Sequence, residues 1–300
     1  MRALVISGGG STGAFAGGVA QYLIEEQGHD YDLYLGTSTG SLLISHLALN
    51  KTQKIKDVYT SVTQKSIFSN KPFLVKRVHG YDQISINHFN VLKNFLKGGK
   101  TFGESHNLKK LILETITPEE FEILKASSKE IVVTVSNLSM NEVEYKSIND
   151  FSYDDFCEWI WISCNYTPFM SLVKKNGCEY ADGGLGSMVP IEEAIKRGAT
   201  EIDAIILQTE VTYFNRLPSK NVFSLITHLF SFMLDRIENQ NIRIGKFVAA
   251  NKNVIVNFYY TPTVLTTNSL IFDKEKMERW WESGYSFAKY KNEELNQIQP

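Results

Sequence analysis

The sequence Gly-Thr-Ser-Thr-Gly, which runs from Gly36 to Gly40, lies where the pattern of the chain changes from strand to helix. The β-prone stretch Tyr31–Leu35 precedes it, and the helix-like stretch Ser41–Leu49 follows it. A Gly-x-Ser-x-Gly sequence in this setting is typical of a nucleophile elbow, a tight turn that presents a serine hydroxyl at the N-terminus of a helix. The two glycines let neighbouring backbone pass close to that turn. The sequence therefore favours an α/β arrangement and makes Ser38 the candidate nucleophile.

A glycine-rich loop follows the first predicted strand. The apolar run Ala3–Ile6 is typical of a buried parallel strand, and the helix-like stretch Ala14–Glu26 begins directly after the loop. Backbone amides in such a loop can converge on one anion, either a phosphate or the oxyanion of an acyl-transfer intermediate. The loop lacks the Gly-Lys-Ser/Thr ending of a nucleotide-binding loop, so acyl transfer is the better fit. The expected oxyanion donors are the amides of Gly8, Gly9, Gly10 and Thr39, and Gly13 is the last glycine of the loop.

A carboxylate is the expected general base. Asp182 ends the second strand of a predicted hairpin over residues 171–181 and is followed by Gly183 and Gly184. Taken alone, Asp-Gly-Gly is more typical of a turn in which the aspartate binds local amides. A triad in the chain order serine, acid, histidine needs a histidine after Asp182, and only His228 meets that condition. Because His228 lies inside a helix-like segment, we expect Asp182 to take the serine proton directly.

Four sequence blocks in this order resemble the patatin-like phospholipase family. They are the Gly-Gly-Gly-x-x-Gly loop from Gly8 to Gly13, the Gly-x-Ser-x-Gly elbow, the segment Ser163–Phe169 and the Asp-Gly-Gly block. The resemblance covers residues 1 to about 209. It implies a three-layer α/β/α fold with a mostly parallel central sheet. It also implies a lipid ester substrate, an acyl-enzyme on Ser38, and a Ser38–Asp182 dyad that needs no metal or other cofactor.

Two positions depart from the pattern of that family. The family usually has Lys or Arg just before the last glycine of the loop, where this chain has Thr12. It often has Asn a few residues after Asp-Gly-Gly, where this chain has Met188. A cation that would face the oxyanion or a lipid phosphate is therefore missing at position 12. The nucleophile and the base stay in place, so these changes concern efficiency and the preference for anionic phospholipids.

Strand and helix patterns alternate along the chain, which is typical of a parallel sheet covered by helices. An apolar content of 43% in 300 residues is enough for one large core, so we expect a single domain over residues 1–300. Further strands are expected at residues 130–135, 142–146, 202–207 and 253–260. Residues 51–128 read as a mostly helical insertion over the active-site face, and residues 221–300 as C-terminal helices with a late strand.

The stretch from Asn221 to Ala250 is apolar almost all round in its first part. This pattern is typical of a core helix, and a lipid-facing wall or lid is the alternative.

Composition narrows the partners and the compartment. The net charge of −2 gives no sign of nucleic-acid binding. The cysteines Cys157, Cys164 and Cys178 lack metal-binding spacing, and reduced thiols suit the cytosol. No signal peptide and no run of membrane-span length is visible. We expect a cytoplasmic protein that meets membranes transiently, if at all.

The expected function is a serine acyl hydrolase of phospholipase A or lysophospholipase type, which cleaves fatty-acyl esters of lipids. Two alternatives stay open. One is an acyltransferase that uses the same dyad and passes the chain to an alcohol or a lysolipid. The other is a lipid-binding protein on the same scaffold that has lost catalysis.

Overall fold

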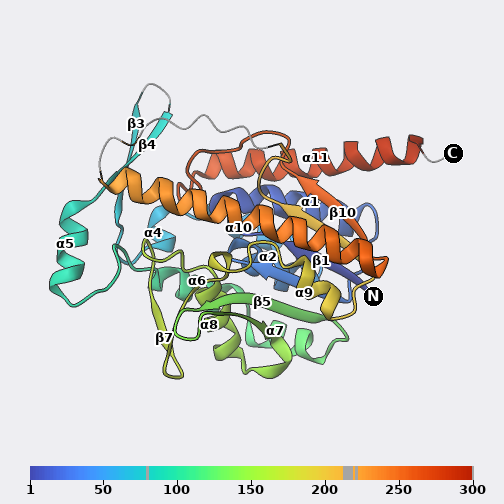
Figure 1. The fold of residues 1–300 in the computed structure, drawn as a ribbon, viewed down its shortest axis with the longest axis horizontal. Helices are drawn as coiled ribbons and strands as arrows, with labels where there is room; N and C mark the ends of the chain where they lie inside the picture. The colour runs from blue at the N-terminus through green and yellow to red at the C-terminus, as the bar shows by residue number, and fades with distance from the viewer. Residues whose placement is uncertain (79–80, 212–218, 220–221, 299–300) are drawn as a thin grey trace.

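The computed structural model describes residues 1–78, 81–211, 219 and 222–298. Its central sheet is formed by β1 (Arg2–Ile6), β2 (Leu33–Thr37), β5 (Glu130–Asn137), β6 (Glu142–Ser147), β7 (Val173–Lys175), β8 (Cys178–Asp182), β9 (Glu201–Ile206) and β10 (Ile255–Tyr260). The strand order is β10-β9-β1-β2-β5-β8-β7, with β6 beside β5 (Figure 1). Strands β10, β9, β1, β2 and β5 run parallel, and β6, β7 and β8 are antiparallel to their neighbours. The prediction of a mostly parallel sheet is therefore confirmed.

Helices cover both faces of this sheet. Alternating residues of β1 enter two separate cores, because successive side chains of a strand point to opposite faces. Leu4 and Ile6 pack in one core, which includes side chains of α1 (Gly13–Glu25), α2 (Thr39–Ala48), α8 (Tyr153–Ser163) and α11 (Lys274–Ile298). Ala3 and Val5 pack in the other core, together with side chains of α9 (Ile191–Lys196) and α10 (Val222–Lys252). The result is the three-layer arrangement that the sequence predicts.

The segment 51–128 contains a strand pair as well as helices. Its helices are α3 (Thr52–Ser61), α4 (Gln64–Ile67), α5 (His88–Leu96), α6 (His106–Thr115) and α7 (Pro118–Ala126). Strands β3 (Phe73–Val78) and β4 (Tyr81–Ile86) pair in antiparallel orientation, with Val78 opposite Tyr81. This hairpin was not expected from the sequence, although two β-prone runs separated by two residues are its usual signal.

Helix α10 is the longest of the described helices. The expectation of a core helix is wrong for one of its sides. Leu229 is 53% exposed and Phe232 is 61% exposed, while Ile242 and Ala249 are buried. Asn221, at the start of the segment considered in the sequence, lies outside the described residues. Within the described ranges, none of the helices has the length and hydropathy of a transmembrane span.

Candidate active site

Strand β5 brings the ends of two other strands together. Its first part pairs with β2, and Thr37 lies opposite Thr134. Its last part pairs with β8, and Asp182 lies opposite Val135. Because β6 occupies the other edge of β5, β2 and β8 lie along the same edge. Thr37 and Asp182 therefore face consecutive residues of β5. The residue after Thr37 is Ser38, so the two predicted catalytic residues meet at this point of the sheet.

Ser38 occupies a strained turn at the start of α2. Its backbone has φ 51° and ψ −119°, a conformation that residues other than glycine rarely adopt. The neighbouring glycines are required by close packing of the backbone. A Cβ at Gly40 would lie 2.3 Å from the carbonyl oxygen of Ile6, and a Cβ at Gly36 would lie 2.5 Å from the amide nitrogen of Ser41. These contacts explain both glycines of the Gly-x-Ser-x-Gly sequence.

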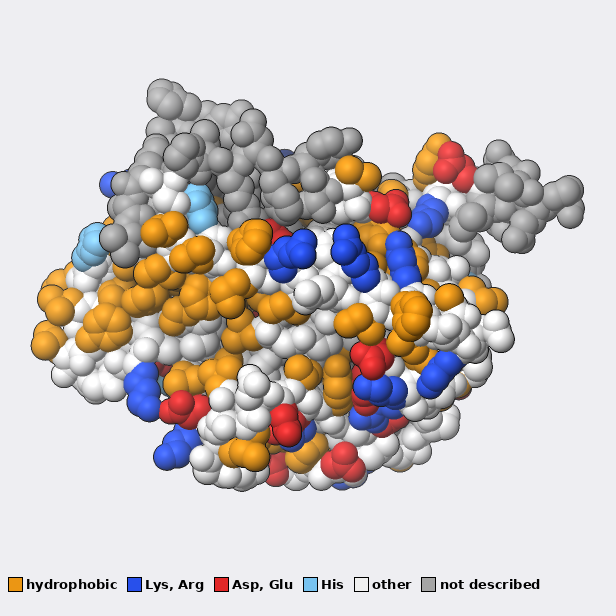
Figure 2. Space-filling view, viewed as in Figure 1, with side chains coloured by type: hydrophobic (Ala, Val, Ile, Leu, Met, Phe, Trp, Pro, Cys, Tyr) orange, Lys and Arg blue, Asp and Glu red, His pale blue; other side chains and the backbone are white. Residues whose placement is uncertain are grey.

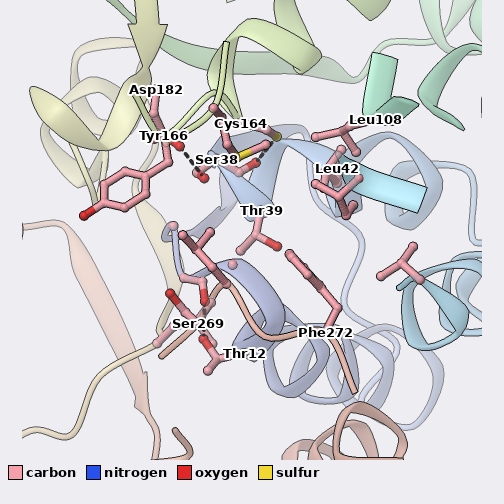
Figure 3. Close-up of a pocket in the computed structure, with 18 of the residues that line it drawn as sticks. Thr12, Ser38, Thr39, Leu42, Leu108, Cys164, Tyr166, Asp182, Ser269 and Phe272 are labelled. Carbon is pink, nitrogen blue, oxygen red and sulfur yellow. Dashed lines mark hydrogen bonds between the residues drawn. The ribbon is translucent and has the colours of Figure 1, made fainter. Parts of the chain in front are cut away.

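The side chains of Ser38 and Asp182 are hydrogen bonded (Figure 3). The Ser38 hydroxyl donates to Oδ2 of Asp182 at 2.7 Å, and Oδ1 accepts from the amide of Gly184 at 2.8 Å. Asp182 is buried, and this burial raises its pKa to about 7, although both hydrogen bonds favour the charged form. A carboxylate with this pKa can accept a proton at neutral pH more readily than an ordinary aspartate.

Two glycines allow Asp182 to reach this position. A Cβ at Gly183 would lie 2.2 Å from the carbonyl oxygen of Thr134, and a Cβ at Gly184 would lie 2.7 Å from Cε of Met188. Asp182 thus binds a local backbone amide, as expected for an aspartate in an Asp-Gly-Gly turn. It also presents the second carboxylate oxygen to the serine.

The glycine-rich loop packs against Ser38. A Cβ at Gly8 would lie 3.1 Å from Cβ of Ser38, so the loop and the nucleophile are in direct contact. Gly10 has φ +56°, and a Cβ there would lie 2.4 Å from the carbonyl oxygen of Ser269. Thr12 is buried and carries no charge, and its hydroxyl donates to the carbonyl oxygen of Gly9 at 2.8 Å.

The predicted oxyanion donors differ in their availability. The amide of Gly8 donates to the carbonyl oxygen of Met188 at 3.4 Å, a long and weak hydrogen bond. Within the described part of the chain, the amides of Gly9, Gly10 and Thr39 have no hydrogen-bond acceptor. All four residues line the same cavity as Ser38. Three of the four amides are therefore unoccupied beside the nucleophile.

Tyr59 joins the loop to the nucleophile helix, a role that the sequence analysis missed. Its hydroxyl donates to the carbonyl oxygen of Gly10 at 2.5 Å and is hydrogen bonded to the hydroxyl of Thr39. A Cβ at Gly13 would lie 2.3 Å from this hydroxyl, so the last glycine of the loop makes room for it. Nothing in the helical pattern of α3 distinguishes Tyr59 from a core residue.

The last residue of α8 and the residue that follows it hold the backbone of Ser38 from the other side. Oγ of Ser163 accepts a hydrogen bond from the Ser38 amide at 2.9 Å, and it is hydrogen bonded to the Ser41 hydroxyl at 2.8 Å. The buried thiol of Cys164 donates to the Ser38 carbonyl oxygen at 3.1 Å. Burial raises the pKa of that thiol well above its usual value, so it stays protonated and serves as a donor.

A cavity of about 450 Å³ opens in front of Ser38 and Asp182. Its lining contains both apolar and polar side chains. Helices α2, α3, α6 and α8, with the segment before α11, contribute apolar side chains, among them Leu42, Ile55, Val58, Val62, Leu108, Ile112, Ile160 and Phe272. Figure 3 shows Leu42, Leu108 and Phe272 on the same side of Ser38 and Thr39. Helix α10 and residues 266–269 contribute polar side chains, among them Thr227, His228, Ser231, Asp235, Glu238 and Asn268.

The polar part of the cavity contains acids and lacks cations. Among the described residues that line the cavity there is no Lys or Arg. Glu238 is buried, and its Oε1 has no hydrogen-bond partner. Burial and the nearby Asp235 raise the pKa of Glu238 to about 8. With Thr12 in the loop and no Lys or Arg among the described lining residues, the site lacks the positive charge that the family pattern places near the oxyanion.

Histidines also line the cavity, but they do not bond to the nucleophile. His46 is buried in α2, and burial lowers its pKa. His228 lies on α10, where its Nδ1 is 2.8 Å from the hydroxyl of Ser219. In the ranges that the structure covers, the Ser38 hydroxyl has Asp182 as its hydrogen-bond partner. Over the same ranges, no group of three or more His, Cys, Asp or Glu side chains is placed to hold a metal ion.

Comparison with known proteins relates this geometry to a family. The sequence matches the family model described as patatin-like phospholipase over residues 4–195. A search of curated proteins found no match. Among solved structures, the chain is similar to the crystal structure of VipD from Legionella pneumophila, with 16% sequence identity and a TM-score of 0.50. The match covers 96% of this chain and 66% of the VipD chain, slightly less than two thirds, and at this identity it shows the fold alone.

The family match has a broader basis, because it covers more than half of the chain and includes the glycine-rich loop, Ser38 and Asp182. The chain therefore belongs to the patatin-like phospholipase family, a family of lipid acyl hydrolases.

Proposed function

We propose that this protein hydrolyses fatty-acyl esters of lipids through an acyl-enzyme on Ser38, with Asp182 as the general base. The observation that carries the proposal is the 2.7 Å hydrogen bond from the Ser38 hydroxyl to a buried carboxylate. This carboxylate lies in the same cavity as the unoccupied amides of the glycine-rich loop. A nucleophile, a base and oxyanion donors on one small volume are what acyl transfer requires.

In the first half of the reaction, Oγ of Ser38 attacks the ester carbonyl carbon while its proton passes to Oδ2 of Asp182. The carbonyl oxygen becomes an oxyanion and accepts hydrogen bonds from the amides of Gly9, Gly10 and Thr39, with Gly8 as a further donor if it leaves Met188. The tetrahedral intermediate then expels the alcohol part of the lipid, which takes the proton from Asp182. The acyl chain stays on Ser38 as an ester.

In the second half, a water molecule attacks the acyl-enzyme. Asp182 takes a proton from this water, and the fatty acid leaves as the same proton passes from Asp182 to Oγ of Ser38. The same carboxylate thus acts as base and then as acid in each half.

The apolar part of the cavity supports an acyl chain as the group that Ser38 holds. Side chains of α2, α3, α6 and α8 form this part next to the elbow. An acyl chain that leaves water for such a surface gains roughly 0.8 kcal/mol for each buried methylene. The proposal includes a lipid ester as the partner, transient contact with a membrane surface and no nucleic acid. It also includes a cytoplasmic location, which the free thiols of Cys157, Cys164 and Cys178 suit.

The decisive experiment combines covalent labelling with product analysis. A fluorophosphonate should label the wild type on Ser38 and leave Ser38→Ala unlabelled, and only the wild type should release fatty acid from a mixed lipid extract. Removal of a nucleophile typically lowers the rate by several orders of magnitude. Retained lipid hydrolysis in Ser38→Ala would contradict the proposal. An unlabelled wild type would support the non-catalytic alternative.

The acyltransferase alternative is tested in the same assay. Addition of a lysolipid acceptor should leave free fatty acid as the main product. If the acceptor collects the acyl chain instead, the dyad stands and the reaction class changes.

A further inference from the structure

Helix α10 exposes apolar side chains on the side that faces away from the cavity. Most of their spacings, of three, four and eleven residues, are close to whole turns of a helix, so they form one stripe along it. The stripe contains Leu225, Leu229, Phe232, Met233, Ile244 and Phe247, and all six are among the most exposed large apolar residues of the described chain. The opposite side of the helix packs Phe230, Leu234 and Ile242 against the two cores. It also lines the cavity with Thr227, Ser231 and Glu238. An ordinary surface helix is apolar only on the side that faces the core, whereas α10 has apolar side chains on its outward side as well.

The charges of α10 are sorted in the same way. Arg236 and Arg243 are exposed and lie on the apolar stripe. The acidic residues of the helix, Asp235 and Glu238, both line the cavity on the other side. The outward surface is therefore apolar and cationic, although the whole chain has a net charge of −2.

Helix α5 continues this surface. It exposes Phe89, Leu92, Phe95 and Leu96, and Leu96 is 79% exposed. Its charged side chain is Lys93, and Lys97 follows at its end. Figure 2 shows hydrophobic side chains gathered over the region where Figure 1 draws α5 and the first part of α10, with Lys and Arg side chains further along α10.

We infer that the outward stripe of α10 and the exposed side of α5 form a docking surface for an anionic lipid bilayer. Amphipathic helices with Phe and Leu on one side and Lys or Arg beside them bind in the plane of the membrane interface. Anionic headgroups attract such cations by about 1 kcal/mol for each Lys or Arg near the surface. A second copy of the chain fits this surface less well. In a two-fold contact, the surface would face itself and bring Arg236 and Arg243 against the same cations of the partner copy.

Helix α10 itself contacts a residue that lines the candidate active site. Oδ1 of Asn241, which lies on α10 between the two parts of the stripe, accepts a hydrogen bond from the amide of Met188 at 2.7 Å. Met188 contacts the positions of Gly8 and Gly184. A docked α10 would lie between the bilayer and the cavity, so that a lipid enters beside this helix. The inference rests on the proposed lipid substrate, but membrane binding itself needs no catalysis.

Vesicle co-sedimentation of the full chain tests the inference. The protein carries Ser38→Ala so that it does not degrade the vesicles. The protein with the unchanged surface should bind anionic vesicles, made of phosphatidylcholine with about 30% phosphatidylglycerol. It should bind vesicles of pure phosphatidylcholine several-fold more weakly. Phe232→Gln with Met233→Gln should lower the affinity about tenfold or more. The double variant Arg236→Gln with Arg243→Gln should lower the affinity for anionic vesicles about fivefold for each charge removed. Its affinity for pure phosphatidylcholine vesicles should not change.

Matched substitutions outside the surface serve as controls. Ile123→Gln on α7 removes an exposed apolar side chain, and Lys110→Gln on α6 removes an exposed cation. Both should bind vesicles like the parent protein. With Ser38 restored, all of these variants should hydrolyse a monomeric short-chain ester at the parent rate, which shows that they fold.

Equal vesicle binding by the parent and the α10 variants would overturn the inference. So would a parent protein that sediments as a dimer, becomes monomeric in Phe232→Gln with Met233→Gln, and ignores vesicles. The proposed function fails separately. An enzyme that hydrolyses the monomeric ester but does not bind vesicles refutes only the docking surface, and one that binds vesicles but hydrolyses nothing refutes only the catalytic proposal.

Discussion

Oγ of Ser163 accepts a hydrogen bond from the backbone amide of Ser38 at 2.9 Å. Ser163 is fully buried at the end of α8, and it also bonds to the hydroxyl of Ser41 in the first turn of α2. One hydroxyl thus ties the strained turn to the helix that follows it.

Ser163→Ala should therefore lower kcat while KM changes little, because the Ser38 amide loses its acceptor and the elbow loses its fixed position. The loss of one buried hydrogen bond costs about 1–3 kcal/mol, which corresponds to roughly fivefold to 150-fold in rate. Steady-state kinetics on a soluble ester would measure the effect. Ser61→Ala, which removes an exposed hydroxyl on α3, is the matched control. An unchanged kcat in Ser163→Ala would show that the turn is held without this contact.

Asp182→Asn should abolish hydrolysis and at the same time stabilise the fold. The pKa of Asp182 is about 7 in the folded state, above its reference of 3.8, so the folded protein prefers the protonated form. The free energy of unfolding therefore falls as pH rises from the unfolded pKa to the folded pKa, and the full cost is present above pH 7. Asparagine cannot ionise and avoids this cost. Thermal unfolding at pH 5 and pH 8 should show a larger gain in Tm for Asp182→Asn at pH 8.

The comparison with Ser38→Ala sharpens that test. Ser38→Ala removes the donor to Asp182 but leaves the carboxylate, so it should not gain stability selectively at high pH. A Tm of Asp182→Asn below that of the wild type at pH 8 would mean that the buried charge is compensated by contacts beyond its two hydrogen bonds.

The rate should follow the ionisation of one carboxylate. Because Asp182 must be charged to accept the proton, kcat/KM should rise with pH up to about 7 and then reach a plateau. The apparent pKa should change little with temperature, since carboxylate ionisation has a small enthalpy and imidazole ionisation a large one. Profiles at two temperatures distinguish these groups. The pH profile of His228→Gln should be the same as that of the wild type. If this rise with pH is lost in His228→Gln, the general base is a histidine.

Leu42→Trp should discriminate between acyl chain lengths. Leu42 lines the apolar part of the cavity one turn after Ser38, so an indole there occupies space meant for the chain. Hydrolysis of a long-chain ester should fall at least tenfold relative to an acetyl ester of the same alcohol. Val211→Trp, at an exposed position outside the cavity lining, should leave the ratio unchanged. A parallel loss on both esters in Leu42→Trp would indicate damage to the elbow rather than a blocked chain.

Much of this site is visible in the sequence because it depends on local backbone. Gly36, Gly40 and Gly10 are needed where a Cβ would strike another backbone atom, and such positions produce short glycine patterns. Asp182 can be found for the same reason, since Gly183 and Gly184 mark its approach to the sheet. The order of the blocks then points to one family.

The remaining features depend on contacts between distant segments. Tyr59 and Ser163 look like ordinary helix residues until the fold brings them to the loop and the elbow. The exposure of Phe232 could not be predicted either, because the sequence of a helix that is apolar all round does not indicate which side packs against the core. Only the three-dimensional position of α10 shows that apolar side chains lie on its outward side as well as on its core-facing side.

The arrangement of β5 has a consequence for how this protein tolerates substitutions. Thr134 and Val135, adjacent on one strand, set the spacing between the elbow and the base. A slip of either neighbouring strand by one residue would turn Asp182 or Thr37 to the opposite face of the sheet. The distance between Ser38 and Asp182 thus depends on the spacing of two neighbouring residues of β5. Substitutions that loosen the centre of β5 should therefore abolish hydrolysis even where both of these side chains are unchanged.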